Sequence, residues 1–407
     1  MNKESSATEK NQEGNGASAG LPLIVWLVFV FTIITCIGGQ KFLTYNMSGY
    51  GWFIPLVYSL VLFPLRMHKM KFPVFLWTPW VIVALIYMLF SDYASLQRTM
   101  QLICPIIIGI IVSTYEFGER QIVAFLQLCK YLAVALVIIT FLKSGIASTG
   151  TLPLVTGLAS EVMTGALLCT IFAAGYAINQ KRDILWWSMI AVLPVIALTR
   201  TAMAVTGLTL PTTFAPLKLR TRAFILVLIC LLGVAIFYTP RVQGKMFYSG
   251  KGDITDIFTE DFGDSGRYNM WEYMNYGIEE KPWFGHGTGG GEDYIRNITM
   301  GDSGYPHNDW LLTLYDYGIV GTVIYAASLL FAALHAFIKG QKTQGTIRML
   351  FLSGAATFIP FALIMFTDNI MVYASFYGNL QFTLLGIAYA SLSTDPIVKT
   401  KKIKIKW

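Results

Sequence analysis

Charged residues are scarce in this 407-residue chain: 13% are Asp, Glu, Lys or Arg, whereas 55% are hydrophobic. A soluble domain of this size needs about twice that charge on its surface. Apolar runs of roughly twenty residues recur along the chain, and each is long enough to cross a hydrocarbon core about 30 Å thick. Because the runs are continuous rather than alternating, they predict membrane-spanning helices and not the strands of a barrel.

Several signatures of chemistry are also missing. The five cysteines all fall inside apolar runs, so we predict no disulfide framework, and no CxxC pair or Cys/His cluster suggests a metal. There is no P-loop, and no Asp-x-Asp pair of the kind that holds a divalent cation for a nucleotide-sugar donor. We therefore expect no metal and no cofactor, and a donor that carries its own activated phosphate within the membrane.

Apolar segments that could cross the membrane number about twelve. This predicts an all-α, polytopic membrane protein. The segments are 21–39, 51–65, 72–90, 99–115, 121–142, 161–180, 184–199, 201–216, 223–238, 309–337, 346–367 and 370–392.

The placement of basic residues predicts the topology. Five lysines follow Pro396, so this tail is expected in the cytoplasm. Counting back from it, every second short loop is basic, while the short loops between them carry only Lys41, Arg98 and Lys143. This pattern fits twelve spans with both termini inside. We interpret the net charge of +7 as topology and contact with phospholipid, and not as nucleic-acid binding.

This topology divides the chain into five parts. Residues 1–20 form a polar cytoplasmic tail that is expected to be disordered and is not a signal peptide, and residues 21–238 hold helices one to nine. Residues 239–308 form a large periplasmic loop with six Lys/Arg and eleven Asp/Glu. Residues 309–395 hold the last three helices, and 396–407 are the basic tail. The loop is the segment large enough for an extracytoplasmic subdomain.

His307 is the candidate catalytic residue. It lies at the end of this loop in YPHNDW, where Asn308 and Asp309 can cap the following helix. An imidazole at a membrane surface can take a proton from a hydroxyl near neutral pH. The alternative is a capping segment with an incidental histidine. Asp368, in the last outer turn, is a candidate supporting residue on the same face.

Four cations are candidates for binding a phosphate group: Arg200, Arg267, Arg241 and Lys245. Arg200 lies in the apolar stretch ALTRTAMAV at the outer membrane edge, where a guanidinium needs an anion or solvent. Its fork of donors suits phosphate oxygens, although snorkelling to the interface is the alternative. Arg267 starts a predicted amphipathic helix at 266–280 that is expected to lie along the membrane surface, and its alternative is an ion pair with Glu272 or Asp264.

Two further features invite interpretation. Lys130, inside the fifth predicted span, is a functional candidate because intramembrane charges are costly. The glycine cluster GHGTGGG at 285–291 lacks the GK[ST] ending of a phosphate loop, so we interpret it as a flexible turn with His286 as a bystander.

These residues together resemble the O-antigen polymerase and O-antigen ligase superfamily (Wzy and WaaL). The loop ends in His-Asn and runs into a Gly-Ile-x-Gly helix, here PHNDWLLTLYDYGIVG. The middle of the loop reads GRYNMW and then PWFGHG, and LTRT precedes the loop. The resemblance covers roughly residues 185–335 by motif and the remainder by topology.

The resemblance implies a GT-C-like fold in the bacterial inner membrane and a glycosyltransferase of lipopolysaccharide biosynthesis. His307 would be the general base or the organiser of the acceptor, and Arg200 and Arg267 would hold a lipid diphosphate. Whether Arg241 or Lys245 is the third cation stays open, and a lysine would lack the bidentate fork. The implied partners are undecaprenyl-diphosphate-linked oligosaccharide, phospholipid and a chain-length regulator protein. No metal is required, because diphosphate is a good leaving group.

Three activities stay open. The first is a repeat-unit polymerase that transfers the growing glycan to the non-reducing sugar of an incoming lipid-linked unit, with inversion. The second is a ligase that transfers the finished glycan to lipid A–core. The third is a twelve-helix transporter, although a transporter of the major facilitator type usually carries its long loop on the cytoplasmic side.

Overall fold

The chain is described by a computed structural model that covers residues 20–38, 41–42, 45–89, 93–144, 159–178, 181–259, 261–263, 266–301, 304–371 and 373–392. The tails predicted at 1–20 and 396–407 lie outside these residues, except for Gly20. The described part is helical apart from one short antiparallel pairing of β1 (Lys41–Phe42) with β2 (Tyr45–Asn46) and an isolated bridge between Phe247 and Phe262. The all-helical class is therefore confirmed, whereas the GT-C-like architecture stays a prediction.

Helices follow the predicted apolar segments in order. Before the long loop they are α1 (Leu23–Ile37), α2 (Met47–Arg66), α3 (Thr78–Met88), α4 (Tyr93–Ser113), α5 (Glu119–Lys143), α7 (Ala159–Ile178), α8 (Asp183–Ala191), α9 (Leu193–Ile196), α10 (Arg200–Leu208) and α11 (Leu219–Phe237). The loop holds α12 (Pro240–Met246), α13 (Arg267–Glu280) and α14 (Gly290–Ile298), and after it come α15 (Asp309–Gln341), α16 (Gly345–Ala356), α17 (Phe358–Ile364) and α18 (Gly378–Ser391). Short 3₁₀ turns are η1 (Met67–Lys69), η2 (Val74–Leu76), η3 (Ile254–Phe258) and η4 (Ala374–Phe376).

Fewer than twelve of these helices have the length of a full span. In the described residues, seven are long and apolar enough to cross a membrane, and three shorter apolar helices accompany them. The predicted span 201–216 is the clearest difference, because α10 ends at Leu208 after nine residues. At 1.5 Å per residue that is roughly 13 Å, far less than a bilayer core. Pro211 explains the early end, since the residue before a proline is disfavoured in helical geometry.

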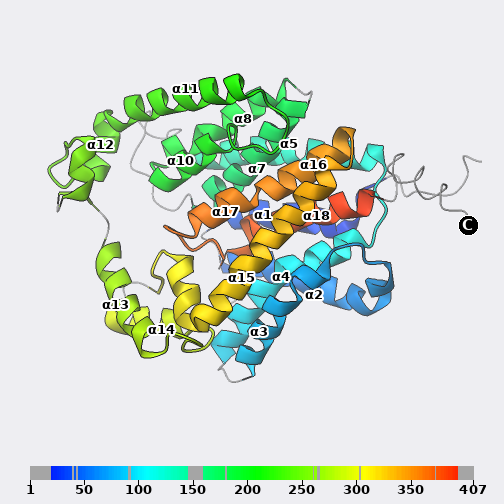
Figure 1. The fold of residues 1–407 in the computed structure, drawn as a ribbon, viewed down its shortest axis with the longest axis horizontal. Coiled ribbons are helices and arrows are strands. Elements are labelled where there is room, and N and C mark those ends of the chain that lie inside the picture. Colours follow the sequence, from blue (N-terminus) through cyan, green and yellow to red (C-terminus); the bar gives the residue numbers. More distant parts are fainter. Residues whose placement is uncertain are drawn as a thin grey trace, which may run out of the picture.

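Helices in the interior of the bundle and at its edge differ sharply in how much of their surface is buried. Every residue of α18 is buried, and α18 packs closely against α4 and α16. At the other extreme, α11 buries no side chain and runs along one edge of the molecule (Figure 1). A helix that is apolar all round and unburied has hydrocarbon as its natural surrounding. The sequence of α11 therefore fits contact with lipid.

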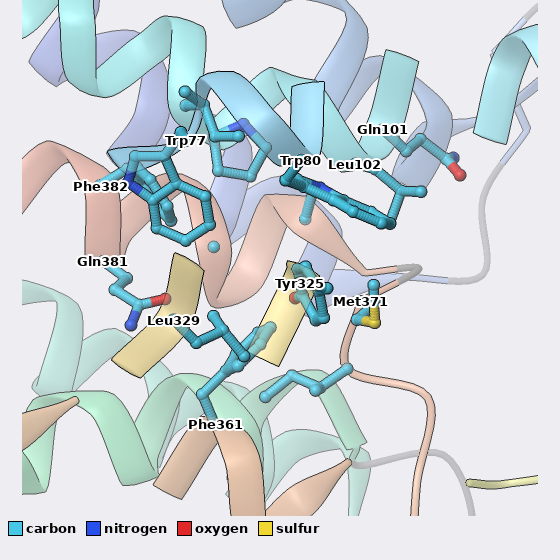
Figure 2. Close-up of a pocket in the computed structure, with 15 residues that line it drawn as sticks. Trp77, Trp80, Gln101, Leu102, Tyr325, Leu329, Phe361, Met371, Gln381 and Phe382 are labelled. Atoms are coloured by element: carbon cyan, nitrogen blue, oxygen red, sulfur yellow. The ribbon is translucent and has the colours of Figure 1, made fainter. Parts of the chain in front are cut away.

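A small internal cavity lies between α3, α4, α15 and the start of α18. Its volume is about 30 Å³, and aromatic side chains including Trp77, Trp80 and Tyr325 surround it together with Gln101 and Gln381 (Figure 2). A cavity of this volume holds one or two water molecules and excludes a sugar. The interior of the bundle is therefore packed, and a substrate site has to be sought nearer the loop.

Lys130 has a local explanation. Its Nζ lies 3.2 Å from Oδ1 of Asp183 at the start of α8, and 5.8 Å from the ring centre of Trp186. A β-carbon at Gly175 of α7 would collide with the Asp183 carboxylate, so the glycine leaves room for this pair. The charge of Lys130 is therefore compensated by an ion pair between α5 and α8, and its functional role stays a prediction.

The Gly-Ile-x-Gly motif marks a break in α15. Gly318 has φ 63° and ψ −172°, a conformation that is essentially restricted to glycine. The backbone of the preceding loop enters this break: the N–H groups of His286 and Gly287 donate to the carbonyls of Tyr315 and Asp316, both at 2.9 Å. Gly321 lies one turn later, where a β-carbon would collide with Tyr317. Both glycines of the motif are thus required by packing.

Replacing Gly318 with alanine should destabilise the protein. The left-handed backbone alone costs on the order of 1–3 kcal/mol for a residue with a side chain. The added methyl group would also meet the backbone of Trp283 and Phe284. We expect a clearly lower melting temperature for the detergent-solubilised variant. Gly233→Ala on α11, where a β-carbon meets no atom within 4 Å, is the matched control and should melt at or slightly above the temperature of the unaltered protein.

Candidate active site

The helices of the long loop gather at one end of the molecule, where α12, α13 and α14 lie on the left of Figure 1. A small apolar cluster fixes α12 there: Val242, Met246 and Phe247 pack against Leu198, just before α10. This cluster brings the chain after α11 back to the start of α10. The start of α10 and the end of the segment that follows α11 therefore lie side by side.

Arg200 is the first residue of α10. Its Nη2 donates a hydrogen bond of 3.0 Å to the carbonyl of Gly263, and its guanidinium carbon lies 4.7 Å from the ring centre of Phe262. Leu198, two residues earlier, has a positive φ of 50°, so the chain turns sharply just before the arginine. Arg200 is thus held between α10 and the long loop and does not simply extend into solvent.

Lys245 lies among the three arginines. Its Nζ donates a hydrogen bond of 2.9 Å to the carbonyl of Leu198. Partial burial lowers the pKa of Lys245 below its usual 10.5, and the charges of Arg200, Arg267 and Arg241 lower it further. Like charges act on one another in this way only when they are close. The structure therefore gathers all four predicted cations into one electropositive cluster, which we name the cation cluster.

Arg267 is the first residue of α13. Its Nη1 donates a hydrogen bond of 2.9 Å to the carbonyl of Thr367, in the turn after α17. Its Nε is buried and has no hydrogen-bond partner among the described residues. The expected alternative, an ion pair with Glu272, does not form, and Asp264 lies outside the described residues. Arg267 is thus a fixed cation with an unsatisfied donor, a suitable partner for an anionic oxygen.

His307 lies close to the turn that holds Arg267. Its Nδ1 is 3.6 Å from Oδ1 of Asp368 and 3.2 Å from the side-chain nitrogen of Asn369. The imidazole is 39% exposed, so it remains accessible to a substrate. Its backbone has a positive φ of 51°, which is uncommon for a residue with a side chain and recurs at functional sites.

Two polar groups at Nδ1 determine where the imidazole carries its proton. Asn369 is 1% exposed, and its side-chain oxygen has no hydrogen-bond partner among the described residues. The two ends of an amide have nearly the same shape, and we assign the oxygen to the side that faces the imidazole, because Nδ1–H then has two acceptors, this oxygen and the Asp368 carboxylate. The amide oxygen then accepts Nδ1–H, beside the Asp368 carboxylate, and Nε2 keeps the lone pair of a base.

One tripeptide connects these elements. Thr367 accepts the hydrogen bond from Arg267 through its carbonyl, and its hydroxyl bonds at 2.7 Å to the hydroxyl of Thr201, the neighbour of Arg200. Asp368 and Asn369 face His307. We call residues 367–369 the bridging turn. It joins the start of α10, where Arg200 lies, to Arg267 at the start of α13 and to His307 just before α15.

The entry to α15 is fixed separately. Asn308 caps the helix, because its side-chain oxygen accepts a 3.1 Å hydrogen bond from the backbone of Leu311. Asp309 does not cap; it is fully buried and accepts a 2.7 Å hydrogen bond from the backbone N–H of Met371. Of the two residues that follow His307, Asn308 therefore caps α15 and Asp309 holds the segment after the bridging turn.

The glycine cluster, which we expected to be a flexible turn, is hydrogen-bonded to α15. The backbone N–H groups of Gly289 and Gly291 donate to the two carboxylate oxygens of buried Asp316, each at 2.8 Å. His286 stacks on Tyr315 with ring centres 4.3 Å apart, and its Nε2 lies 2.6 Å from the carbonyl of Gly277. These contacts bind the loop to α15 and give His286 a structural position away from the cation cluster.

Two groups were not found from the sequence. Thr367 and Asn369 lie in MFTDNIM, where an Asp–Asn pair between two apolar segments was the available signal. Arg98, which we interpreted as a loop charge, is buried on α4 and pairs with Glu292 of α14, with its guanidinium carbon 5.5 Å from the ring centre of Tyr305. Arg98 thus anchors the long loop to the bundle at two points, Glu292 and Tyr305, and the second of these is two residues before His307.

Comparison with protein families gives one match. Residues 152–326 match the family model Wzy_C, described as O-antigen ligase. This segment is thus similar to the O-antigen ligase family, consistent with the Wzy and WaaL superfamily. Its members are glycosyltransferase-like enzymes that act on lipid-linked oligosaccharides. With the apolar helices, the match indicates an integral protein of the inner membrane. A comparison with curated proteins gives no match.

Proposed function

We propose, starting from the similarity of residues 152–326 to the O-antigen ligase family, that the chain is a polysaccharide repeat-unit polymerase. It transfers the growing glycan from undecaprenyl diphosphate to the non-reducing sugar of an incoming lipid-linked repeat unit, at the periplasmic face. The observation that carries this proposal is the bridging turn, which contacts Arg267 of the cation cluster on one side and His307 on the other.

The geometry suits a single displacement. The cation cluster would bind the donor diphosphate and stabilise the charge that develops on its oxygens as the bond to the anomeric carbon breaks. Nε2 of His307 would accept the proton of the acceptor hydroxyl as that oxygen attacks the anomeric carbon from the opposite side. Attack opposite the leaving group inverts the anomeric centre. The diphosphate leaves as an anion, so no general acid is needed.

An apolar groove offers a place for the lipid of the donor. It has a volume of about 520 Å³ and lies between α15 and the α16–α17 pair, with Phe214 at one wall. Its lining along α15 extends from Trp310, three residues after His307, to Phe337. Because α15 is broken at Gly318, Trp310 lies beside Tyr325 with ring centres 6.3 Å apart. The continuous part of the lining, Ala326 to Phe337, is therefore roughly 17 Å long, about half of a bilayer core. A polyprenyl chain in the groove would present its diphosphate at the end where His307 lies.

A ligase is the second candidate, and the description of the matching family favours it. Both enzymes would use the same donor and the same cation cluster, and they differ in the acceptor. Deletion of the gene separates them. Loss of the polymerase should leave single repeat units on lipid A–core, whereas loss of a ligase should leave none. A gel of surface glycan without any attached repeat unit would therefore replace the polymerase proposal with the ligase.

Lys245→Met should reduce the rise in melting temperature that pyrophosphate causes, without destabilising the ligand-free protein. The charged form of Lys245 is disfavoured in the folded state, because its pKa is lowered by partial burial and three arginines. Between the lowered pKa and 10.5 the unfolded chain binds more protons, so stability rises with pH in that window. The substitution removes the same repulsion at every pH.

Thermal unfolding with and without inorganic pyrophosphate measures both effects. We expect a ligand-free melting temperature for Lys245→Met that equals or exceeds that of the unaltered protein, and a smaller upward shift with pyrophosphate. Lys251→Met is the control, since Lys251 is an exposed lysine of the same loop. An unchanged pyrophosphate shift in Lys245→Met would remove Lys245 from the proposed site.

A further inference from the structure

The outward face of α13 has an unusual composition. Eight of its side chains are exposed, and Lys and Arg are absent from them. They comprise three tyrosines, three glutamates and two asparagines: Tyr268, Asn269, Glu272, Tyr273, Asn275, Tyr276, Glu279 and Glu280. We call this set the tyrosine–glutamate face. The opposite side packs on the protein through Met274, which is fully buried, and Gly277, which lies against Tyr315.

This face is poorly suited to the membrane surface where we expected the helix to lie. Helices that bind the interface present Lys and Arg to lipid phosphates and large apolar side chains to the acyl region. The exposed charges here are three carboxylates. Glu272 accepts a 3.0 Å hydrogen bond from the hydroxyl of Tyr276, and this bond raises the pKa of Tyr276. Negative groups arranged in this way would face lipid phosphates unfavourably.

The same groups suit a neutral sugar chain. A pyranose has a face of C–H groups bordered by hydroxyls, so an aromatic ring can cover the C–H face while carboxylates and amides bond the hydroxyls. Tyr268 and Tyr276 are 58% and 54% exposed, and they lie eight positions apart in the helix. At 1.5 Å per residue their rings are separated by roughly 12 Å along the axis, a span of about two sugar rings.

The position of α13 ties this face to the proposed reaction centre. Arg267, its first residue, belongs to the cation cluster and bonds to the bridging turn. Trp271 donates a 2.8 Å hydrogen bond from Nε1 to the carbonyl of Pro306, the residue before His307. The ring centres of Tyr268 and Trp271 lie 5.5 Å apart, edge to face. A glycan on the tyrosine–glutamate face would thus begin within one helical turn of the residues that support His307.

We propose that the tyrosine–glutamate face of α13 is a binding surface for the glycan, and that it takes neutral sugars in preference to uronic acids. This inference rests on the proposed function, since it assigns part of the same substrate to a surface beside the reaction centre. Carboxylates accept hydrogen bonds from sugar hydroxyls but repel a carboxylate on the sugar. The negative charge of this face therefore favours neutral glycans over acidic ones.

Binding of a lipid-free glycan tests this surface directly. The full chain in detergent is titrated with a neutral oligosaccharide of the repeat unit, released by mild acid from the lipid-linked form, and Kd is measured by calorimetry. We expect Tyr268→Ala/Tyr276→Ala to weaken binding at least fivefold. We expect Glu272→Gln/Glu279→Gln to improve binding of an oligosaccharide that carries a uronic acid. Tyr248→Ala, an exposed tyrosine outside α13, is the control.

The outcomes separate this surface from the catalytic proposal. His307→Ala should bind the oligosaccharide as the unaltered protein does, while losing transfer. If His307→Ala keeps transfer, the catalytic proposal fails and the binding surface is unaffected. Equal Kd values for Tyr268→Ala/Tyr276→Ala and the control would overturn the binding surface. Shielding of Tyr276→Cys from an impermeant maleimide in proteoliposomes would overturn it too, because the face would then be in lipid.

Discussion

His307→Ala should abolish the glycan ladder while the protein still folds and inserts in the membrane. A general base contributes about 10²–10⁴-fold to rate. Nε2 is the nitrogen left for that role, since Nδ1 faces Asp368 and Asn369. The measurement is the chain-length profile of surface glycan in a deletion strain that carries the variant, together with transfer by purified protein.

Two further variants separate a base from a structural histidine. His68→Ala changes an exposed histidine in η1 and should leave the ladder intact. Asn369→Asp keeps an oxygen at Nδ1 and should retain transfer, with the acidic side of its pH profile shifted to higher pH because a second carboxylate stabilises the protonated imidazole. Asn369→Leu should lose most transfer. A normal ladder from His307→Ala would end the case for a base at this position.

Arg267→Ala should lower transfer by about 10²–10³-fold, the usual effect of removing one donor that stabilises developing negative charge. Arg267 is held by Thr367 and keeps a buried Nε without a partner among the described residues, so it is already positioned for an anion. Transfer by purified protein, at saturating lipid-linked donor, gives the change in kcat. Arg200→Lys should also be strongly impaired, since lysine lacks the planar fork.

The matched control is Arg296→Ala. Arg296 lies in the same long loop, but it is 57% exposed and pairs with Asp293 on the surface of α14. Exposed pairs of this kind contribute little. We therefore expect normal transfer and an unchanged melting temperature. Equal transfer by Arg267→Ala and Arg296→Ala would mean that only the total positive charge of the loop matters. The cation cluster would then not be a specific binding site for the donor.

Much of the fold followed from hydropathy because long apolar runs have few options in lipid. The helices α5, α7, α11 and α15 begin and end within a few residues of the predicted segments, apart from a longer α15. Where proline and threonine compete with the helix, hydropathy was a poor guide. Thr209 and Thr212 bond back to carbonyls of α10, beside Pro211, and the predicted span stops at Leu208.

The site was only partly visible in the sequence because distant segments meet there. Arg200, Arg267 and His307 stood out as polar residues in characteristic contexts, but their roles stay predictions. Thr367 and Asn369 did not stand out, since an uncharged side chain becomes informative only when its neighbours are known. The contacts of the glycine cluster were not foreseen for the same reason: its partner, Asp316, lies 25 residues or more away in sequence.

The bridging turn also bears on side reactions. A donor held by diphosphate would be exposed to attack by water whenever a base stood ready before the acceptor arrived. Because Thr367 and Asn369 are two residues apart in one turn, a shift of Arg267 on the phosphates would carry over to the imidazole. We expect binding of the carrier lipid and the orientation of the imidazole to be mechanically linked, so that hydrolysis of an idle donor depends on how its phosphates position the bridging turn.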